Sequence, residues 1–282
     1  MRVLTVNAGS SSLKLRVIGV ADAVLATADL PRQALESVAD VIGQFVLQGP
    51  PPDAVGHRVV HGGHDFQGPL LVDARVEAAL DRLADLAPLH NPPAIEAVKA
   101  LRRLQPDLPQ VACFDTAFHA GLPAEAATYA LPMEWNARWQ LRRYGFHGLS
   151  HAYASRRAAE LMGRPLGDLR LVTAHLGSGA SLAAVAAGRS VDTTMGFTPL
   201  EGLVMGTRAG DLDPGLVLWL LRTGGLSTDD VAEALETRAG LLGLSCVSAD
   251  LRLVLDAADA GDAHAGLAYG VYLHRLRAGV AG

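Results

Sequence analysis

Two turns rich in glycine and serine carry residues that could bind phosphate. The first, at residues 7–14, reads Asn-Ala-Gly-Ser-Ser-Ser-Leu-Lys, and the second, at residues 175–181, reads His-Leu-Gly-Ser-Gly-Ala-Ser. Small residues let backbone N–H groups approach phosphate oxygens closely, and hydroxyl groups add further donors. The first turn lacks the GK[ST] ending of a Walker A loop. Taken alone, it is equally compatible with an ordinary serine-rich hairpin turn.

Charged residues beside strand ends and glycines could bind and neutralise an anion. Arg58 ends an apolar segment beside glycines, and Arg208 lies in a glycine-rich loop. Guanidinium groups bind carboxylate and phosphate through paired N–H donors. Asp115 directly follows another apolar segment, where its carboxylate could bind magnesium or orient a nucleophile. The alternative for Asp115 is an N-cap of a following turn.

Histidines raise the alternative of a metal-dependent hydrolase. His57, His61 and His64 fall within eight residues, and His119 could join them. No carboxylate or cysteine accompanies them at ligand spacing, so zinc is the weaker hypothesis. The segment 142–151 is more informative, because a purely structural loop rarely needs two Arg, two His and two Gly in ten residues. Ser150, within it, could also cap the helix that follows.

Strands and helices must position these residues. Apolar runs, many of them alternating, predict strands at 2–6, 13–19, 24–30, 54–60, 110–114, 169–174 and 181–186. Helical patterns cover 33–47, 74–86, 94–104, 152–162, 216–222, 228–239, 250–258 and 263–277. The unit of strand, Gly/Ser turn and strand occurs in both halves, which favours two related α/β domains at 1–150 and 151–282.

Composition limits the classes of function. The 282 residues are 50% apolar and 19% charged, which is typical of well-packed domains. The formal net charge of −5 argues against nucleic-acid and anionic-membrane partners, although not against phosphate substrates. Cys113 and Cys246 are too isolated for a disulfide framework or a zinc ribbon. We find neither a signal peptide nor a membrane span and expect a cytoplasmic protein.

Seven segments together resemble the acetate kinase family, within the superfamily of sugar kinases, heat-shock ATPases and actin. They are 7–14, 57–63, 86–92, 114–119, 143–151, 175–181 and 193–214, in the order of the family. The resemblance implies the duplicated ribonuclease H-like (actin-like ATPase) α/β fold, with ATP and substrate in the cleft between domains. It also implies reversible phosphoryl transfer between ATP and acetate, which yields ADP and acetyl phosphate, with Mg²⁺ or Mn²⁺. A homodimer is the assembly that the resemblance suggests.

The resemblance also implies a role for each matching residue. Arg58 and Arg208 would hold the acyl phosphate and the transferred phosphoryl group, and His147 would donate to the same group and stabilise the transition state. Asp115 would position the acid or the magnesium, and Asn7 would lie near the metal and the γ-phosphate. The apolar pocket for the acyl chain would comprise Val60, Leu89, Phe146 and Pro199. Nucleotide-binding residues would be Ser10, Ser12, Lys14, His175, Gly177, Ser178 and Gly179.

Two departures from the family bear on these predictions. Ser178 stands where the family usually has Asn, so that the donor at the second turn is shorter. The family also continues past the helix ending at Arg277 with an adenosine-binding motif and a metal-binding glutamate, neither of which we find before Gly282. We therefore expect an incomplete second domain with an open strand edge.

Acetate kinase is thus the leading prediction, with two alternatives. One methylene group discriminates acyl substrates by only about 1–3 kcal/mol, so a propionate kinase stays open. A catalytically impaired remnant that only binds phosphate ligands is the alternative from a different class.

Overall fold

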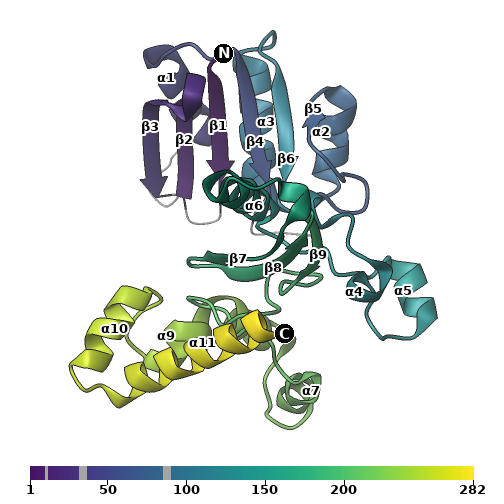
Figure 1. Ribbon diagram of the computed structural model, residues 1–282, viewed down its shortest axis with the longest axis vertical. Coiled ribbons are helices and arrows are strands. Elements are labelled where there is room, and N and C mark those ends of the chain that lie inside the picture. Colours follow the sequence, from purple (N-terminus) through teal and green to yellow (C-terminus); the bar gives the residue numbers. More distant parts are fainter. Residues whose placement is uncertain (10–11, 32–36, 85–89) are drawn as a thin grey trace. The chain divides into compact units, whose positions relative to one another are not determined.

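The computed structural model of the chain describes residues 1–9, 12–31, 37–84 and 90–282 (Figure 1). These residues form two compact units, 1–120 and 121–282. The predicted boundary at residue 150 lies inside the second unit, because the segment from Gly121 onward packs with the C-terminal half. The functions assigned to the two halves stay predictions. Ser10, Leu89 and parts of the predicted helices 33–47 and 74–86 lie outside the described residues.

The first unit is built on a six-stranded sheet with the order β3-β2-β1-β4-β6-β5. Its strands are β1 (Val3–Ala8), β2 (Ser12–Ile18), β3 (Val24–Pro31), β4 (Ala54–Val59), β5 (Leu70–Leu71) and β6 (Gln110–Phe114). β2 pairs antiparallel with both β1 and β3, whereas β1, β4 and β6 run parallel to one another. The carboxyl ends of three neighbouring strands therefore meet at one edge, where α/β proteins place their ligands.

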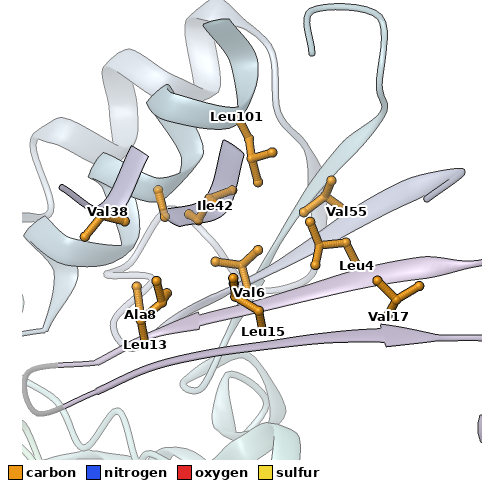
Figure 2. Packing of buried hydrophobic residues seen from close by; sticks show 11 residues of the cluster. Leu4, Val6, Ala8, Leu13, Leu15, Val17, Val38, Ile42, Val55 and Leu101 are labelled. Carbon is orange, nitrogen blue, oxygen red and sulfur yellow. The ribbon is translucent and has the colours of Figure 1, made fainter. Parts of the chain in front are cut away.

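Helices α1 (Val38–Gln48) and α3 (Asn91–Leu104) cover a core on this sheet, and α2 (Ala74–Asp81) packs beside α3. Alternate residues of β1 and β2 are buried, as the period of a half-buried strand requires. Figure 2 shows Leu4, Val6 and Leu15 of the strands facing Ile42 and Leu101 of the helices. The opposite side-chain row of β1 and β2 is only partly buried or exposed and includes polar residues such as Asn7 and Lys14.

The second unit contains an antiparallel sheet with the order β7-β8-β9 and a helical region. Its strands are β7 (Arg170–Leu176), β8 (Ala180–Ala186) and β9 (Arg189–Thr193), and α6 (Gly148–Met162) packs on β7. The other helices are α4 (Ala124–Ala127), α5 (Met133–Trp139), α7 (Pro214–Arg222), α8 (Thr228–Glu233), α9 (Gly240–Ser245), α10 (Leu251–Asp259) and α11 (Ala263–Ala281). Helices α9, α10 and α11 enclose a core with Leu241, Val254 and Ala268 (Figure 1).

Both predicted hairpins are confirmed, as β1–β2 and β7–β8. Five elements were not predicted from the sequence, because their hydrophobic patterns are too brief to stand out: β5, β9 and the short helices α4, α5 and α9. Ser150 as an N-cap was wrong: α6 begins at Gly148 after His147, so Ser150 lies in its first turn. None of the helices in the described ranges is long and apolar enough to cross a membrane.

Candidate functional site

Asn7, Arg58 and Asp115 form a cluster, here called the Arg58 cluster, at the carboxyl ends of β1, β4 and β6. The guanidinium of Arg58 donates to Oδ2 of Asp115 from Nε at 3.0 Å and from Nη2 at 2.5 Å. Its Nη1 donates to Oδ1 of Asn7 at 3.0 Å. Three residues that lie far apart in the sequence and were each predicted for the site are therefore in direct contact.

Burial and pairing set the charge of the Arg58 cluster. The Asp115 side chain is 2% exposed and that of Arg58 is 29% exposed. Burial alone would lower the pKa of Arg58, but the charge and hydrogen bonds of Asp115 outweigh it, so the pKa is raised. The three bonds above use three of the five N–H donors of a guanidinium. Within the described residues, Arg58 therefore keeps donors for an anionic ligand.

Buried polar side chains fix the turn that follows β4. Asn91 accepts from the backbone N–H of His61 and donates to the His61 carbonyl, both at 3.1 Å. Thr116 accepts from the N–H of Gly62 at 3.0 Å. A Cβ on Gly62 would lie 2.7 Å from the Phe66 carbonyl oxygen, so this close turn requires glycine. Sequence reasoning missed the roles of Asn91 and Thr116, although both belong to segments that it singled out.

Two of the four histidines of the metal hypothesis, His57 and His61, have structural contacts. His57 alternates with Arg58 along β4, and its Nε2 lies 2.8 Å from Oε1 of Gln110. Burial lowers the pKa of His57 to about 4, which keeps the ring neutral. Nδ1 of His61 accepts from the N–H of Gly63 at 2.9 Å. Among the described residues, no three His, Cys, Asp or Glu side chains are grouped to hold a metal ion.

The remaining predicted residues of the first unit lie on β2 and after β4. The N–H of Gly9 donates to the Ser12 carbonyl at 2.9 Å and closes the first turn. Lys14 is exposed and pairs in register with Asn7. Val60 is buried beside the Arg58 strand end. Ser10 and Leu89 lie outside the described residues.

A second cluster, here called the Arg208 cluster, comprises His147, His175, Gly179 and Arg208. A Cβ on Gly179 would lie 3.2 Å from Nε2 of His147 and 3.4 Å from Nη2 of Arg208, so both groups approach this glycine. The rings of His147 and His175 stack with centroids 4.0 Å apart. The carbonyl of Ser178 accepts from the N–H of Gly206 at 3.1 Å, which joins the second Gly/Ser turn to the Arg208 loop.

Arg208 is a half-buried cation whose hydrogen-bond partner is neutral. Its Nη1 donates to the Pro199 carbonyl at 2.8 Å. Burial lowers the pKa of Arg208, and the more distant charge of Glu236 offsets this only in part. In the described part of the chain, no carboxylate forms a salt bridge with it. A desolvated cation of this kind is stabilised by a bound anion.

A hydrogen-bonded latch holds the loop that carries Pro199. The hydroxyl of Tyr129 donates to Oε2 of Glu201 at 2.6 Å and accepts from the N–H of Phe197 at 2.7 Å. Arg143 forms an ion pair with Oε1 of Glu201. Burial, followed by the bond to Glu201, raises the pKa of Tyr129. Sequence reasoning missed this latch, whose members come from three separate segments.

A cavity of about 590 Å³ adjoins the second Gly/Ser turn. Its lining includes Gly177, Ser178, Asp250, Arg252 and Tyr272. The volume lies within the range of cavities that bind small molecules. Phe146, predicted for the acyl pocket, is fully buried elsewhere in the same unit.

The chain is similar to known proteins over almost its whole length. A sequence model of the Acetokinase family matches residues 24–282. An acetate kinase of Streptomyces coelicolor is 44% identical, with coverage of 98% of this chain and 75% of the relative. An acetate kinase of a Synechococcus strain is 52% identical, with coverage of 83% and 58%, respectively. The chain thus spans only part of the length of these relatives.

Solved structures give the same result. An acetate kinase of Porphyromonas gingivalis matches with a TM-score of 0.90 and 36% identity, over 99% of this chain and 78% of that one. A propionate kinase of Francisella tularensis matches with a TM-score of 0.90 and 36% identity, over 99% and 79%. The chain therefore belongs to the acetokinase family and has its α/β fold of the actin-like ATPase type.

Proposed function

We propose that this chain is an acetate kinase, which transfers the γ-phosphoryl group of ATP reversibly to acetate and forms acetyl phosphate and ADP. Membership of the acetokinase family supports the reaction class. The observation that carries the proposal is Arg208, a half-buried, partly desolvated cation beside His147 and a Gly/Ser turn, with no salt bridge in the described residues. Such a group is suited to bind a transferred phosphoryl group.

The chemistry needs charge neutralisation more than a strong base. Acetate is already an anionic nucleophile, and the attacked phosphoryl group is anionic too. Catalysis therefore consists of positioning and of electrostatic stabilisation of the transferred group. In this proposal, the remaining donors of Arg58 bind the carboxylate or acyl phosphate. Arg208 and His147 donate to the phosphoryl oxygens as charge develops on them.

The Arg58 cluster also offers oxygen ligands that suit Mg²⁺. Arg58 contacts only Oδ2 of Asp115, so Oδ1 of the carboxylate is not engaged by this ion pair. The amide oxygen of Asn7 is a second hard donor beside it. Mg²⁺ is commonly held by one or two carboxylates together with waters and substrate phosphates, and Mn²⁺ accepts the same ligands. The bound ion would neutralise charge on the nucleotide phosphates.

Nucleotide binding is assigned to the second unit. Gly177 and Ser178 line the 590 Å³ cavity, so the ATP phosphates would bind along the turn from His175 to Gly179 with the nucleoside in the cavity. Ser12 and Lys14 are proposed as phosphate contacts of the first unit. Ser178 supplies a hydroxyl where the family usually has an amide, which shortens the reach of that donor.

Propionate is the second candidate acceptor, because the Francisella propionate kinase matches this fold as closely as the Porphyromonas acetate kinase does. Val60, Phe146 and Pro199 are proposed for the acyl pocket. An additional methylene changes discrimination by about 1–3 kcal/mol, which is the effect that a substrate comparison would measure. We also propose that the protein is cytoplasmic and forms a homodimer.

The test is a hydroxamate assay of acetyl phosphate with ATP, Mg²⁺ and either acetate or propionate. We expect turnover with both acids, a higher kcat/KM for acetate, and loss of activity in Arg58→Ala. Arg157→Ala is the control, because this exposed arginine forms an ion pair with Glu160 on the surface of α6. A folded wild-type chain that binds ATP without turnover would contradict the proposal and support the phosphate-binding remnant instead.

A further inference from the structure

A chain of hydrogen bonds runs from His147 into the interior of the second unit. Nδ1 of His147 lies 2.9 Å from Oγ of Ser181, and Nε2 of His151 lies 2.8 Å from the same oxygen. Nδ1 of His151 lies 2.8 Å from Oγ1 of Thr173. Ser181 and His151 are almost completely buried, and Thr173 is 6% exposed. Ser181, His151 and Thr173 have no role in the site described so far.

We assign a direction to each hydrogen bond by counting the protons available to these groups. Thr173 donates its hydroxyl hydrogen to the carbonyl of Ala183, at 3.4 Å, so its oxygen accepts from His151. A neutral imidazole carries one N–H, so with Nδ1 of His151 as the donor, Nε2 is an acceptor. That nitrogen accepts the single hydroxyl hydrogen of Ser181. The Ser181 oxygen is then left to accept from Nδ1–H of His147.

The other nitrogen of His147 is the one beside the Arg208 cluster. Nε2 lies 3.2 Å from the position of a Cβ on Gly179, and Nη2 of Arg208 lies 3.4 Å from the same position. His175 stacks on the ring and is a neighbouring titratable group. With Nδ1 occupied by Ser181, Nε2 is the atom of His147 that faces the glycine turn.

We propose that Ser181, His151 and Thr173 form a positioning relay that holds His147 as the Nδ1–H tautomer and aims Nε2 at the Gly179 turn. The effect of this relay on catalysis rests on the proposed kinase function. From this tautomer, Nε2 donates to a phosphoryl oxygen only when the ring carries a second proton. An adjacent anionic phosphoryl group stabilises that cationic form.

The elements of the fold explain why this arrangement is rigid. Thr173 lies on β7, Ser181 on β8, and His151 on α6, one turn after His147. His147 itself has φ of +57°, a left-handed conformation that is uncommon for residues other than glycine. Removal of the Ser181 hydroxyl would leave two imidazole nitrogens without this partner. We expect the His147 ring then to exchange its tautomer more readily.

The first test reads the tautomer directly. Imidazole ¹⁵N–¹H correlation spectra of the ¹⁵N-histidine-labelled full chain, with His147 assigned through His147→Gln, distinguish a protonated Nδ1 from a protonated Nε2. We expect protonated Nδ1 and unprotonated Nε2 in the wild type above the ring's titration range. In Ser181→Ala, we expect a shift toward the Nε2–H form. A wild-type His147 with protonated Nε2 and unprotonated Nδ1 would overturn the relay.

The second test reads catalysis with matched variants. Ser181→Ala is expected to lower kcat about 10- to 100-fold through misplacement of His147, with the KM values for ATP and acetate little changed. Ser155→Ala is the control, because its hydroxyl is buried on the same helix α6 and donates to the Ala152 carbonyl, outside the relay. We expect kcat of this control to stay within about twofold.

Two substitutions of His151 test the relay independently of Ser181→Ala, in case that variant misfolds. His151→Phe removes the acceptor and should reproduce the loss, whereas the amide oxygen of His151→Gln can accept from Ser181 and should restore most of kcat. Equal activity of these two variants, with an unchanged His147 spectrum, would overturn the proposal. An inactive wild type with the expected spectrum would refute the kinase function while supporting the relay's tautomer assignment.

Discussion

The two candidate arginines have opposite surroundings. Arg58 is bound through two nitrogens to the buried carboxylate of Asp115, and its pKa is raised. Arg208 donates to the carbonyl of Pro199, and burial lowers its pKa. The carboxylate partner fixes Arg58 in place but neutralises most of its charge. Arg208 has no salt bridge among the described residues, so its charge is available to a bound anion.

The sheets beside the two arginines also differ in how many strands contribute residues to each cluster. In the first unit, β1, β4 and β6 are neighbours and run parallel. The ends of these three strands supply the residues of the Arg58 cluster. In the second unit, β7 is an edge strand of its three-stranded sheet. The Arg208 cluster combines His175 of β7 with residues of turns and a loop, and in our proposal the latch and the His147 relay hold these residues in position.

The largest expected effect is on catalysis in Arg208→Ala. Loss of a charged donor to the transferred phosphoryl group should lower kcat by about 10³-fold. The melting temperature should stay constant or rise, because a desolvated cation without a salt bridge contributes little to stability. Steady-state hydroxamate assays and thermal unfolding measure both quantities. A kcat within tenfold of the wild type would remove Arg208 from the proposed chemistry.

For Arg58→Met, we expect a loss of stability, in contrast to the Arg208 variant. This variant leaves the Asp115 carboxylate buried without its cation, so the free energy of unfolding should fall by about 3–5 kcal/mol. Urea unfolding checks the value, and Arg58→Met with Asp115→Leu should recover much of the loss. If Arg58→Met and Arg208→Met have equal effects on stability, the contrast between the two arginines is wrong.

The pH dependence of the first unit provides a third comparison. The pKa of His57 is lowered from 6.5 to about 4 by burial, so the unfolded chain binds the proton more readily. Stability from the neutral ring is complete above pH 6.5 and is lost as pH falls toward 4, by up to about 3 kcal/mol.

Hydrogen exchange at pH 7 and pH 5 can assign this loss to a unit. Protection of β1, β4 and β6 should decrease at pH 5, and the double variant His57→Met with Gln110→Leu should reduce the change. A pH-dependent loss confined to the second unit would contradict the assignment to His57.

The smallest effect is expected for Tyr129→Phe. Loss of its hydroxyl leaves Glu201 and the Phe197 N–H without this bond, which should cost about 1–3 kcal/mol. Because the latch holds the Pro199 loop, kcat should fall more than in Tyr153→Phe, which removes a hydroxyl from an exposed tyrosine of α6. Equal kcat values for the two variants would show that the latch does not position Arg208.

The sequence predicted well what local pattern determines. Alternating apolar residues identified both hairpins, and the apolar run 110–114 correctly placed Asp115 directly after a strand, while its role in the site stays a prediction. The strand β9, Arg-Ser-Val-Asp-Thr, was missed because its polar composition hides a strand that pairs with β8. Element type thus followed from periodicity wherever the apolar signal was long enough.

Contacts between residues that lie far apart in the sequence could not be predicted from local patterns. Tyr129 and Glu201 are joined across 72 positions, and the His147–Ser181 contact spans 34. Nothing in the spacing of these residues specifies their pairing, since it arises only when the strands and loops pack. Ser150 shows the same limit: its hydroxyl lies 2.9 Å from Nδ1 of His175 rather than at the helix N-cap.

The most direct test of the central claim is chemical rescue of Arg208→Ala in the hydroxamate assay with ATP, Mg²⁺ and acetate. If the charge of Arg208 acts on the transferred phosphoryl group, added guanidinium chloride should restore part of kcat, and sodium chloride at equal concentration should not. A variant that forms acetyl phosphate at the wild-type rate without guanidinium would contradict the account.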